Sequence, residues 1–290
     1  MNGVILIDKE QDWTSNDVVS KLKGILHERR IGHSGTLDPM ATGLLVVFVG
    51  RATRAVEFAE GHDKSYRAGL RLGLVTDTQD ITGTVLESKA ADVSEAELVR
   101  VLEGFKGEQL QLPPMYSAIK VKGKRLYDIA RSGGEVERKK RPITIHDISL
   151  AGRDGEDYIL DVSCSKGTYV RTICHDIGAQ LGCGACMSAL RRTRAGGFSV
   201  EQAHKLAEVQ RCADEGRVEE LLIPVDELFS DYEKCSASAA AEKRIRCGNE
   251  YKTVVPDGEY RVYSEKGEFL MLGKAEAGVM KTIKSFFEVS

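Results

Sequence analysis

The sequence lacks the features that mark membrane, secreted and nucleotide-dependent proteins. Its longest apolar run, Leu44 to Val49, is far too short to span a bilayer. The chain does not open with a basic region followed by an apolar stretch, so we expect no secretory signal and a cytoplasmic protein. It contains no GxxxxGKS/T motif and no convincing GxGxxG fingerprint. We therefore expect no nucleotide or dinucleotide cofactor.

Signals for metal sites and disulfides are also sparse. The chain has seven cysteines, an odd number without framework spacing, which indicates reduced thiols. Cys183 and Cys186 form a lone CxxC, and the second pair that a zinc ribbon needs is absent. We expect no metal, and we keep a zinc or redox protein that uses Cys183 and Cys186 as an alternative.

Positive charge is concentrated in one segment of an acidic chain. The net charge of the 290 residues is −3. Between Tyr116 and Pro142, however, nine basic residues stand against three acidic ones, a net charge of +6 that leaves −9 for the rest. A basic segment on an acidic body is typical of a localised phosphate-binding surface. The nine are Lys120, Lys122, Lys124, Arg125, Arg131, Arg138, Lys139, Lys140 and Arg141.

Apolar periodicity and capping signals indicate a chain that mixes helices and strands. Alternating residues predict a strand over 64–72. Ser15 or Asn16 is expected to cap a helix with Val18 and Leu22 on its inner face, and Ser199 to open another capped helix. This mixture favours an α+β fold.

The composition changes after about Pro224. A polar, alanine-rich helix is expected near 236–245, and short strands are expected at 253–255, 260–263 and 269–272, with turn residues between them. We therefore expect a large domain over 1–225, with the basic insertion at about 112–142, and a small β domain over 226–290.

One loop places a single carboxylate in a constrained position. Residues 32–45 read GHSGTLDPMATGLL. Pro39 fixes its own φ and pushes Asp38 toward an extended conformation, while the glycines allow sharp bends. The apolar run from Leu44 predicts a buried strand that anchors the loop. Catalytic groups are commonly presented on rigid loops of this kind.

This loop resembles the signature loop of the TruB-type tRNA pseudouridine synthases, which make pseudouridine 55 in the T loop of tRNA. Other matching segments follow in the family's order: KSY at 64–66, TDTQD at 76–80, PPMYSAIK at 113–120, KGTYVRT at 166–172 and LRRTR at 190–194. Two departures stand out. The segment 10–13 replaces the Pro and Gly that the family usually has there, and Cys186 stands where the family often has a histidine.

The resemblance implies a role for each matching residue. Asp38 would be the catalytic aspartate, Arg171 its partner and Tyr66 the aromatic ring that stacks on the target base. Tyr169 and Leu190 would be pocket walls. His33 would either stack into the place that a flipped base leaves or bond the backbone of its own turn. The other implied RNA contacts are Lys9, Lys64, Lys120, Arg138, Lys139, Lys140, Arg141, Arg191 and Arg192.

The resemblance also implies an architecture and a partner. We expect a pseudouridine synthase catalytic domain with a mixed or antiparallel sheet, a PUA-like C-terminal domain, and a cofactor-free isomerase. The partner would be tRNA, gripped at its T arm, by a monomer without an obligate protein partner. Two alternatives remain. One is an RNA-binding chaperone for tRNA folding, which would not need Asp38 or Arg171. The other is a guide-RNA-dependent enzyme that modifies ribosomal RNA.

Overall fold

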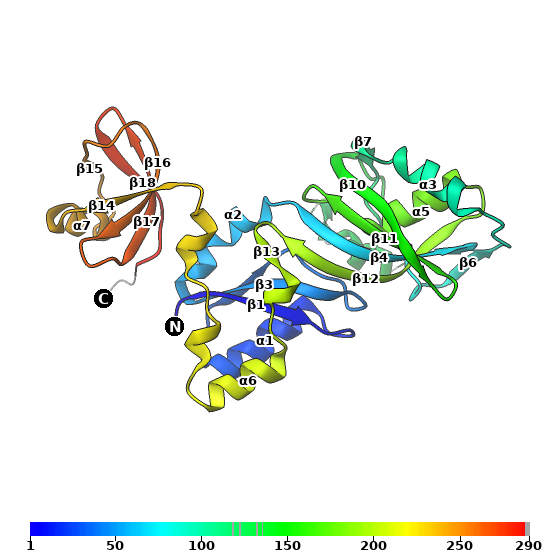
Figure 1. Ribbon diagram of the computed structural model, residues 1–290, viewed down its shortest axis with the longest axis horizontal. Coiled ribbons are helices and arrows are strands. Elements are labelled where there is room, and N and C mark those ends of the chain that lie inside the picture. The colour runs from blue at the N-terminus through cyan, green and yellow to red at the C-terminus, as the bar shows by residue number, and fades with distance from the viewer. Residues whose placement is uncertain (118, 122, 132, 135, 288–290) are drawn as a thin grey trace.

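The molecule is elongated, with a small sheet at one end and a two-stranded hairpin at the other (Figure 1). The computed structural model describes residues 1–117, 119–121, 123–131, 133–134 and 136–287. Within these residues no helix is both long and apolar enough to cross a bilayer. The hairpin is formed by β5 (Leu74–Thr76) and β6 (Val85–Ser88).

In the described part of the chain, nine strands form the central sheet. Seven run in the order β1-β3-β12-β4-β11-β10-β7, and β2 and β13 pair with β3 and β12 off this path. All pairs are antiparallel except β3 and β12, which run parallel. The strands are β1 (Gly3–Lys9), β2 (Ile31–Ser34), β3 (Thr42–Val49), β4 (Lys64–Leu72), β7 (Gly107–Gln111), β10 (Arg141–Asp154), β11 (Asp157–Cys164), β12 (Ala185–Ala195) and β13 (Phe198–Ser199).

Helices cover the two halves of this sheet and enclose separate apolar cores. On β1 and β3, apolar residues of α1 and α6 pack against Ile5, Ile7 and Leu45. On β4, β10, β11 and β12, residues of α3 and α5 pack against Leu70 and Leu160. The helices of this part are α1 (Ser15–Leu26), η1 (Gly50–Ala55), α2 (Val56–Glu60), α3 (Glu95–Glu103), α5 (Val170–Gln180), η2 (Val200–Gln202), α6 (Leu206–Asp214), η3 (Val218–Leu221) and η4 (Val225–Phe229).

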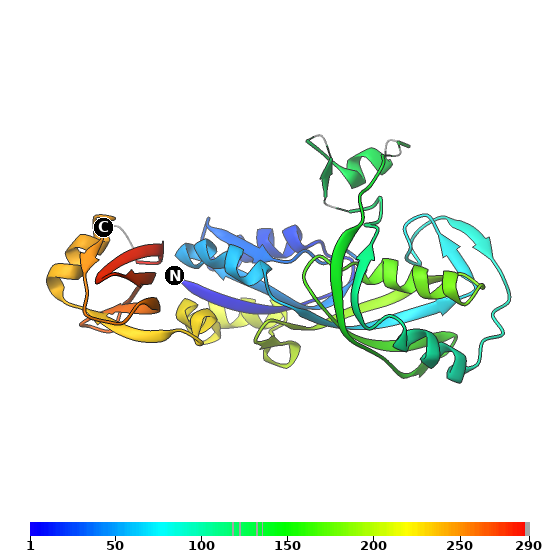
Figure 2. The same ribbon diagram turned by 90° about the horizontal axis from the view of Figure 1, so that it is seen from above.

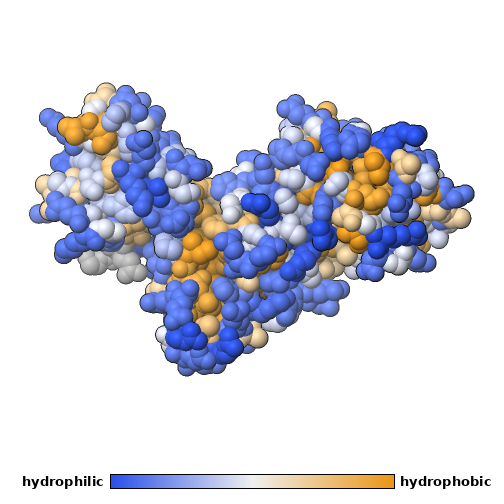
Figure 3. Space-filling view, viewed as in Figure 1, coloured by the Kyte–Doolittle hydropathy of each residue, from blue (hydrophilic) through white to orange (hydrophobic). Residues whose placement is uncertain are grey.

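A second sheet, in the order β14-β16-β17-β18-β15, encloses its own core at the C-terminal end. An aromatic contact joins it to the body, since Phe229 of η4 lies 5.6 Å from Phe286 and 6.1 Å from Phe269 between ring centroids. Figure 3 shows apolar side chains gathered where the segment that joins the two sheets runs. The elements are β14 (Glu233–Ala237), α7 (Ala239–Arg246), β15 (Tyr251–Lys252), β16 (Gly258–Ser264), β17 (Phe269–Glu276) and β18 (Val279–Ser285).

The segment between β7 and β10 stands away from the body (Figure 2). It carries a short hairpin of β8 (Lys120–Val121) and β9 (Lys124–Arg125), followed by α4 (Leu126–Arg131). This is the basic segment of the sequence.

Some expected elements are confirmed and others lie elsewhere. The strands expected at 44–49 and 64–72 are β3 and β4. The expected cap of α1 was wrong: Thr14 is the N-cap, and its hydroxyl accepts a hydrogen bond from Asp17 N at 3.0 Å. Ser199 opens only the short η2, because α6 begins later, at Leu206.

In the C-terminal sheet, the strand expected at 253–255 was wrong, since β15 ends at Lys252. Strand β18 was not anticipated. Within it only Met280 is buried, so the alternation of apolar and polar residues that reveals a strand is weak.

Candidate active site

The Asp38 loop connects β2 to β3 beside the parallel junction of β3 and β12. Three side chains hold it. Ser15 Oγ donates to Leu37 O (3.2 Å) and accepts from Leu37 N (2.9 Å), and Lys9 Nζ donates to Pro39 O (3.2 Å). Arg192 Nη2 donates to Gly35 O at 3.0 Å. The loop is therefore fixed on both sides of its carboxylate.

Gly43 shows how closely the loop approaches β12. A Cβ at this position would lie 2.3 Å from Arg192 O, and the residue has a φ of +96°. Both the space and the backbone conformation exclude a larger residue. The glycine lets β3 and β12 run side by side directly after the loop.

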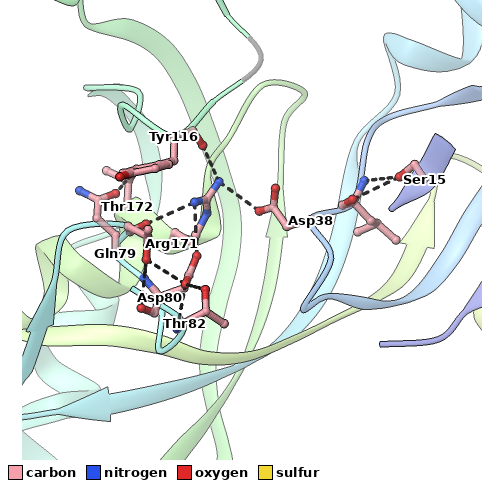
Figure 4. Close-up of polar contacts among 10 residues, drawn as sticks. Ser15, Asp38, Gln79, Asp80, Thr82, Tyr116, Arg171 and Thr172 are labelled. Atoms are coloured by element: carbon pink, nitrogen blue, oxygen red, sulfur yellow. Dashed lines mark hydrogen bonds and ion pairs between the residues drawn. The ribbon is translucent and has the colours of Figure 1, made fainter. Parts of the chain in front are cut away.

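Asp38 faces a buried arginine from the first turn of α5. Arg171 Nη2 lies 3.1 Å from Asp38 Oδ2, and Arg171 is only 6% exposed (Figure 4). The same nitrogen donates to Tyr116 O at 2.9 Å. The other terminal nitrogen, Nη1, donates to Thr78 O (3.2 Å) and Asp80 Oδ2 (3.3 Å). The contact with Asp38 is not bidentate, because the guanidinium gives one terminal nitrogen to each of two carboxylates.

Asp80 is the site residue that the sequence did not single out. It is 4% exposed. Its Oδ1 accepts hydrogen bonds from Thr78 Oγ1 (2.9 Å), Thr82 N (3.0 Å) and Thr82 Oγ1 (2.6 Å), so Asp80 closes its own turn and still bonds Arg171 (Figure 4). The signals in the sequence were its place at the end of the family-like segment TDTQD and the threonines at 78 and 82, which indicate only a local turn.

The surroundings of Asp38 make it harder to ionise than an ordinary aspartate. Burial raises the pKa of Asp38, and the Asp80 carboxylate adds to the rise. Arg171 and, more weakly, Lys9 oppose it. The side chain still keeps 41% of its surface exposed, so it is open to the cleft.

A cleft of about 370 Å³ opens beside this carboxylate. It brings together residues that lie far apart in the sequence. Its walls include Asp38, Arg171, Tyr66, Tyr169, Leu190 and His33. Burial raises the pKa of the Tyr66 and Tyr169 phenols, so both rings stay neutral at physiological pH. The cleft thus presents apolar and aromatic walls next to one carboxylate.

Two of the expected RNA contacts need correction. Lys9 and Arg192 are each 1% exposed. Lys9 Nζ donates to Trp13 O (2.6 Å) and Glu10 O (2.9 Å) as well as to Pro39 O, and Arg192 Nε donates to Leu44 O (2.7 Å). Because their cationic groups are buried against backbone carbonyls, they hold the loop and are not available to phosphates.

Arg191 is partly committed to the protein. Its two terminal nitrogens lie 2.9 and 3.0 Å from the two carboxylate oxygens of Asp8, although 40% of the side chain remains exposed. Lys64 lines the cleft, and its ammonium donates to His62 O at 2.6 Å and Glu60 O at 3.2 Å.

The basic insertion adjoins the site at its base. Tyr116 O contacts Arg171, and Arg138 Nη1 donates to Pro113 O at 2.9 Å. Lys139, Lys140 and Arg141 are exposed. Lys122 and the side chain of Lys120 lie outside the described part of the chain.

The cysteines do not form a site among the described residues. Cys183 and Cys186 are buried and free, and burial raises the pKa of the Cys186 thiol to about 11. Reactive cysteines are instead exposed and have a low pKa. No three His, Cys, Asp or Glu side chains lie together as a metal site in this part of the chain.

Two family models match the chain in succession. The N-terminal domain of the TruB family of pseudouridylate synthases matches residues 23–170, and the C-terminal domain of tRNA pseudouridylate synthase B matches residues 171–230. A tRNA pseudouridine synthase B from Clostridium tetani is 42% identical, with 98% of this chain and 99% of that protein covered. The enzyme of that name from an Azoarcus species is also 42% identical, covering 97% and 93%.

Solved structures agree with this relationship. A Cbf5-Nop10-Gar1 complex contains a chain of 27% identity with a TM-score of 0.74, covering 99% of this chain and 85% of that one. An H/ACA RNP bound to a substrate RNA contains one of 25% identity with the same TM-score. They share a mixed α+β catalytic domain followed by a C-terminal β domain. This chain therefore belongs to the TruB family, and its activity is that of a tRNA pseudouridine synthase, an isomerase.

Proposed function

We propose that this protein converts the uridine at position 55, in the T loop of tRNA, to pseudouridine, with Asp38 as the catalytic group and no cofactor. One observation carries the proposal. A single carboxylate, held by a buried arginine, opens into a cleft walled by Tyr66, Tyr169 and Leu190. The cleft is large enough for one nucleotide.

The chemistry needs one ionised carboxylate and no electron donor. The reaction breaks a C–N glycosidic bond, turns the base and forms a C–C bond at C5, from which a proton leaves. Arg171 contacts Asp38 Oδ2, and no described residue donates to Oδ1. We assign Oδ1 to the substrate, either as a nucleophile toward the sugar or base or as the base that takes a sugar proton.

The target base must leave the folded loop before Asp38 can reach it. Tyr66 and Leu190 are suited to hold the extruded base between an aromatic and an aliphatic surface. His33 lies at the same cleft, and burial lowers its pKa. A neutral imidazole can stack into the place that the base leaves, and we assign His33 this role.

The RNA backbone would be gripped by the basic insertion. Phosphate contacts position an RNA, while a bent loop is recognised largely by its shape. We propose that Lys139, Lys140 and Arg141, which are exposed at the end of the basic insertion, contact the T arm. We also propose that 1–225 acts as the catalytic domain and 226–290 as a PUA-like domain, in a monomer.

The direct test follows the proton that leaves C5. A tRNA transcript labelled with tritium at C5 of its uridines, incubated with the purified protein and no added cofactor, should release one tritium per tRNA. Release of none would contradict the proposed reaction, and release of several would contradict its restriction to one uridine.

Reversing the charge of Lys139, Lys140 and Arg141 to Glu is expected to weaken tRNA affinity and flatten its salt dependence. Each lost phosphate contact lowers the slope of log K against log salt by about 0.7–0.9. The measurement is equilibrium binding over a series of salt concentrations. Because the three side chains are exposed, the unfolding temperature should not change. An unchanged salt slope would place the phosphate contacts elsewhere.

The rate should fall in acid because Asp38 acts as a carboxylate. Since the pKa of Asp38 is raised in the folded protein, kcat/KM is expected to fall as the pH drops through a value above 3.8, the ordinary value for aspartate. A pH–rate profile under conditions where the protein stays folded measures this limb. Activity that persists unchanged down to pH 4 would contradict the assignment.

A further inference from the structure

The cationic side chains that line or support the cleft differ in whether they already bond to other groups of the protein. Lys9 and Arg192 are bonded to backbone carbonyls, Arg171 to two carboxylates and two carbonyls, and Lys64 to two carbonyls. Lys166 also lines the cleft and is exposed. Within the described residues no group accepts a hydrogen bond from its ammonium. Lys166 is therefore the cleft cation that remains available to a ligand.

The backbone that carries Lys166 is fixed, although its ammonium is free. Ser165 N donates to Thr144 O and Thr144 N donates to Ser165 Oγ, both at 2.8 Å. Thr168 Oγ1 donates back to Ser165 O at 2.9 Å, and Gly167 closes the turn with a φ of +79°. This turn fixes the backbone that carries the Lys166 side chain, so little backbone conformational entropy is lost when a ligand binds.

The place of Lys166 relative to the other residues defines what it can touch. Lys64 pairs in register with Cys164, two residues before Lys166, and both lysines line the cleft. Asp38 lies against Arg171, which is buried and whose charge is already compensated by two carboxylates. An anion that enters the mouth thus meets Lys166, rather than Arg171, as its open partner.

A flipped nucleotide brings anions to this position. Rotation of a nucleotide out of its stack occurs about the backbone, so the base enters the pocket while its flanking phosphates stay at the mouth. Within the proposed function, we propose that Lys166 is a substrate-positioning residue whose ammonium binds one of the two phosphates that flank the target uridine. It sets how deeply the base enters and takes no part in bond making.

The test is a coupling experiment between Lys166 and single phosphates. tRNAs are assembled from synthetic fragments that carry one neutral methylphosphonate, either on the 5′ or on the 3′ side of the target uridine. With natural tRNA, Lys166→Ala is expected to lower kcat/KM about tenfold, the value of one charged contact, and Lys166→Arg to restore most of it. One of the two neutral linkages should lower kcat/KM of the wild type by a similar factor. The same linkage should not lower kcat/KM of Lys166→Ala any further.

Lys266→Ala is the matched control, since Lys266 is exposed and likewise precedes a left-handed glycine, Gly267, in a turn that begins with a serine. It should leave kcat/KM unchanged. The inference would be overturned if Lys166→Ala left kcat/KM unchanged. It would also be overturned if, at both linkages, the loss of kcat/KM caused by Lys166→Ala multiplied with the loss caused by the neutral linkage. If Lys166 were only structural, Lys166→Ala would lower the unfolding temperature, and its loss of kcat/KM would multiply with that of either neutral linkage. Failure of the wild type to convert natural tRNA would instead refute the proposed function.

Discussion

Replacing Asp38 by asparagine is expected to lower kcat at least about 10⁴-fold, because an amide can neither attack the substrate nor take up a proton. Affinity for tRNA should be retained, since phosphate contacts made elsewhere supply most of the binding free energy. The measurements are single-turnover conversion and equilibrium binding of the same tRNA. This separation of catalysis from binding is the largest effect that we expect from any single substitution.

The Asp38→Asn variant is expected to fold well. Burial raises the pKa of Asp38 in the folded protein, so the ionised carboxylate costs stability at neutral pH, and the neutral amide removes that cost. Asp161→Asn is the matched control, an equivalent change at an exposed partner of Arg67. It should leave kcat unaltered. Substantial turnover by Asp38→Asn would remove Asp38 from the mechanism and favour a protein that acts on tRNA as a chaperone.

Replacing Arg171 by lysine is expected to lower kcat by about two orders of magnitude, since misplacing a catalytic group by an ångström has a cost of this size. The guanidinium reaches Asp38, Asp80 and two carbonyls from two nitrogens, whereas a lysine ammonium cannot span these positions. Arg171→Ala should also lower the free energy of unfolding by about 3–5 kcal/mol, because it leaves the buried Asp80 without its cation.

Arg67→Lys separates these effects from a general loss of arginine. Arg67 lies on β4, and its ion pair with Asp161 is exposed, so this exchange should change neither kcat nor the unfolding free energy appreciably. Wild-type kcat in Arg171→Lys would show that a point charge suffices to hold Asp38. An undiminished stability of Arg171→Ala would show that Asp80 does not depend on its partner.

The local features of the site were predictable because they depend on neighbours in sequence. Pro39 and the glycines around Asp38 restrict the loop whatever the rest of the chain does, and the apolar run after it forms β3 as expected. The alternation over 64–72 likewise specified β4. That Asp38, Tyr66 and Arg171 share one cleft was expected from the resemblance to a family, and not from any pattern within the chain.

The contacts that hold the site could not be predicted because they join distant segments. Asp80 and Arg171 are 91 positions apart, and Ser15 and Leu37 are 22 apart. Ser15 was expected to cap a helix, which is the commoner local use of a serine there. Lysines and arginines are rarely buried, so the carbonyl groups that enclose Lys9 and Arg192 become evident only in the folded chain.

The central claim is tested most directly by mapping pseudouridine at single-nucleotide resolution in an unmodified tRNA transcript. The transcript is incubated with the wild type or with Asp38→Asn, without a cofactor or a guide RNA. Our account predicts conversion of the uridine at position 55 by the wild type, and no conversion by Asp38→Asn. Conversion at another uridine, equal conversion by both proteins, or conversion only after a guide RNA is added would contradict it.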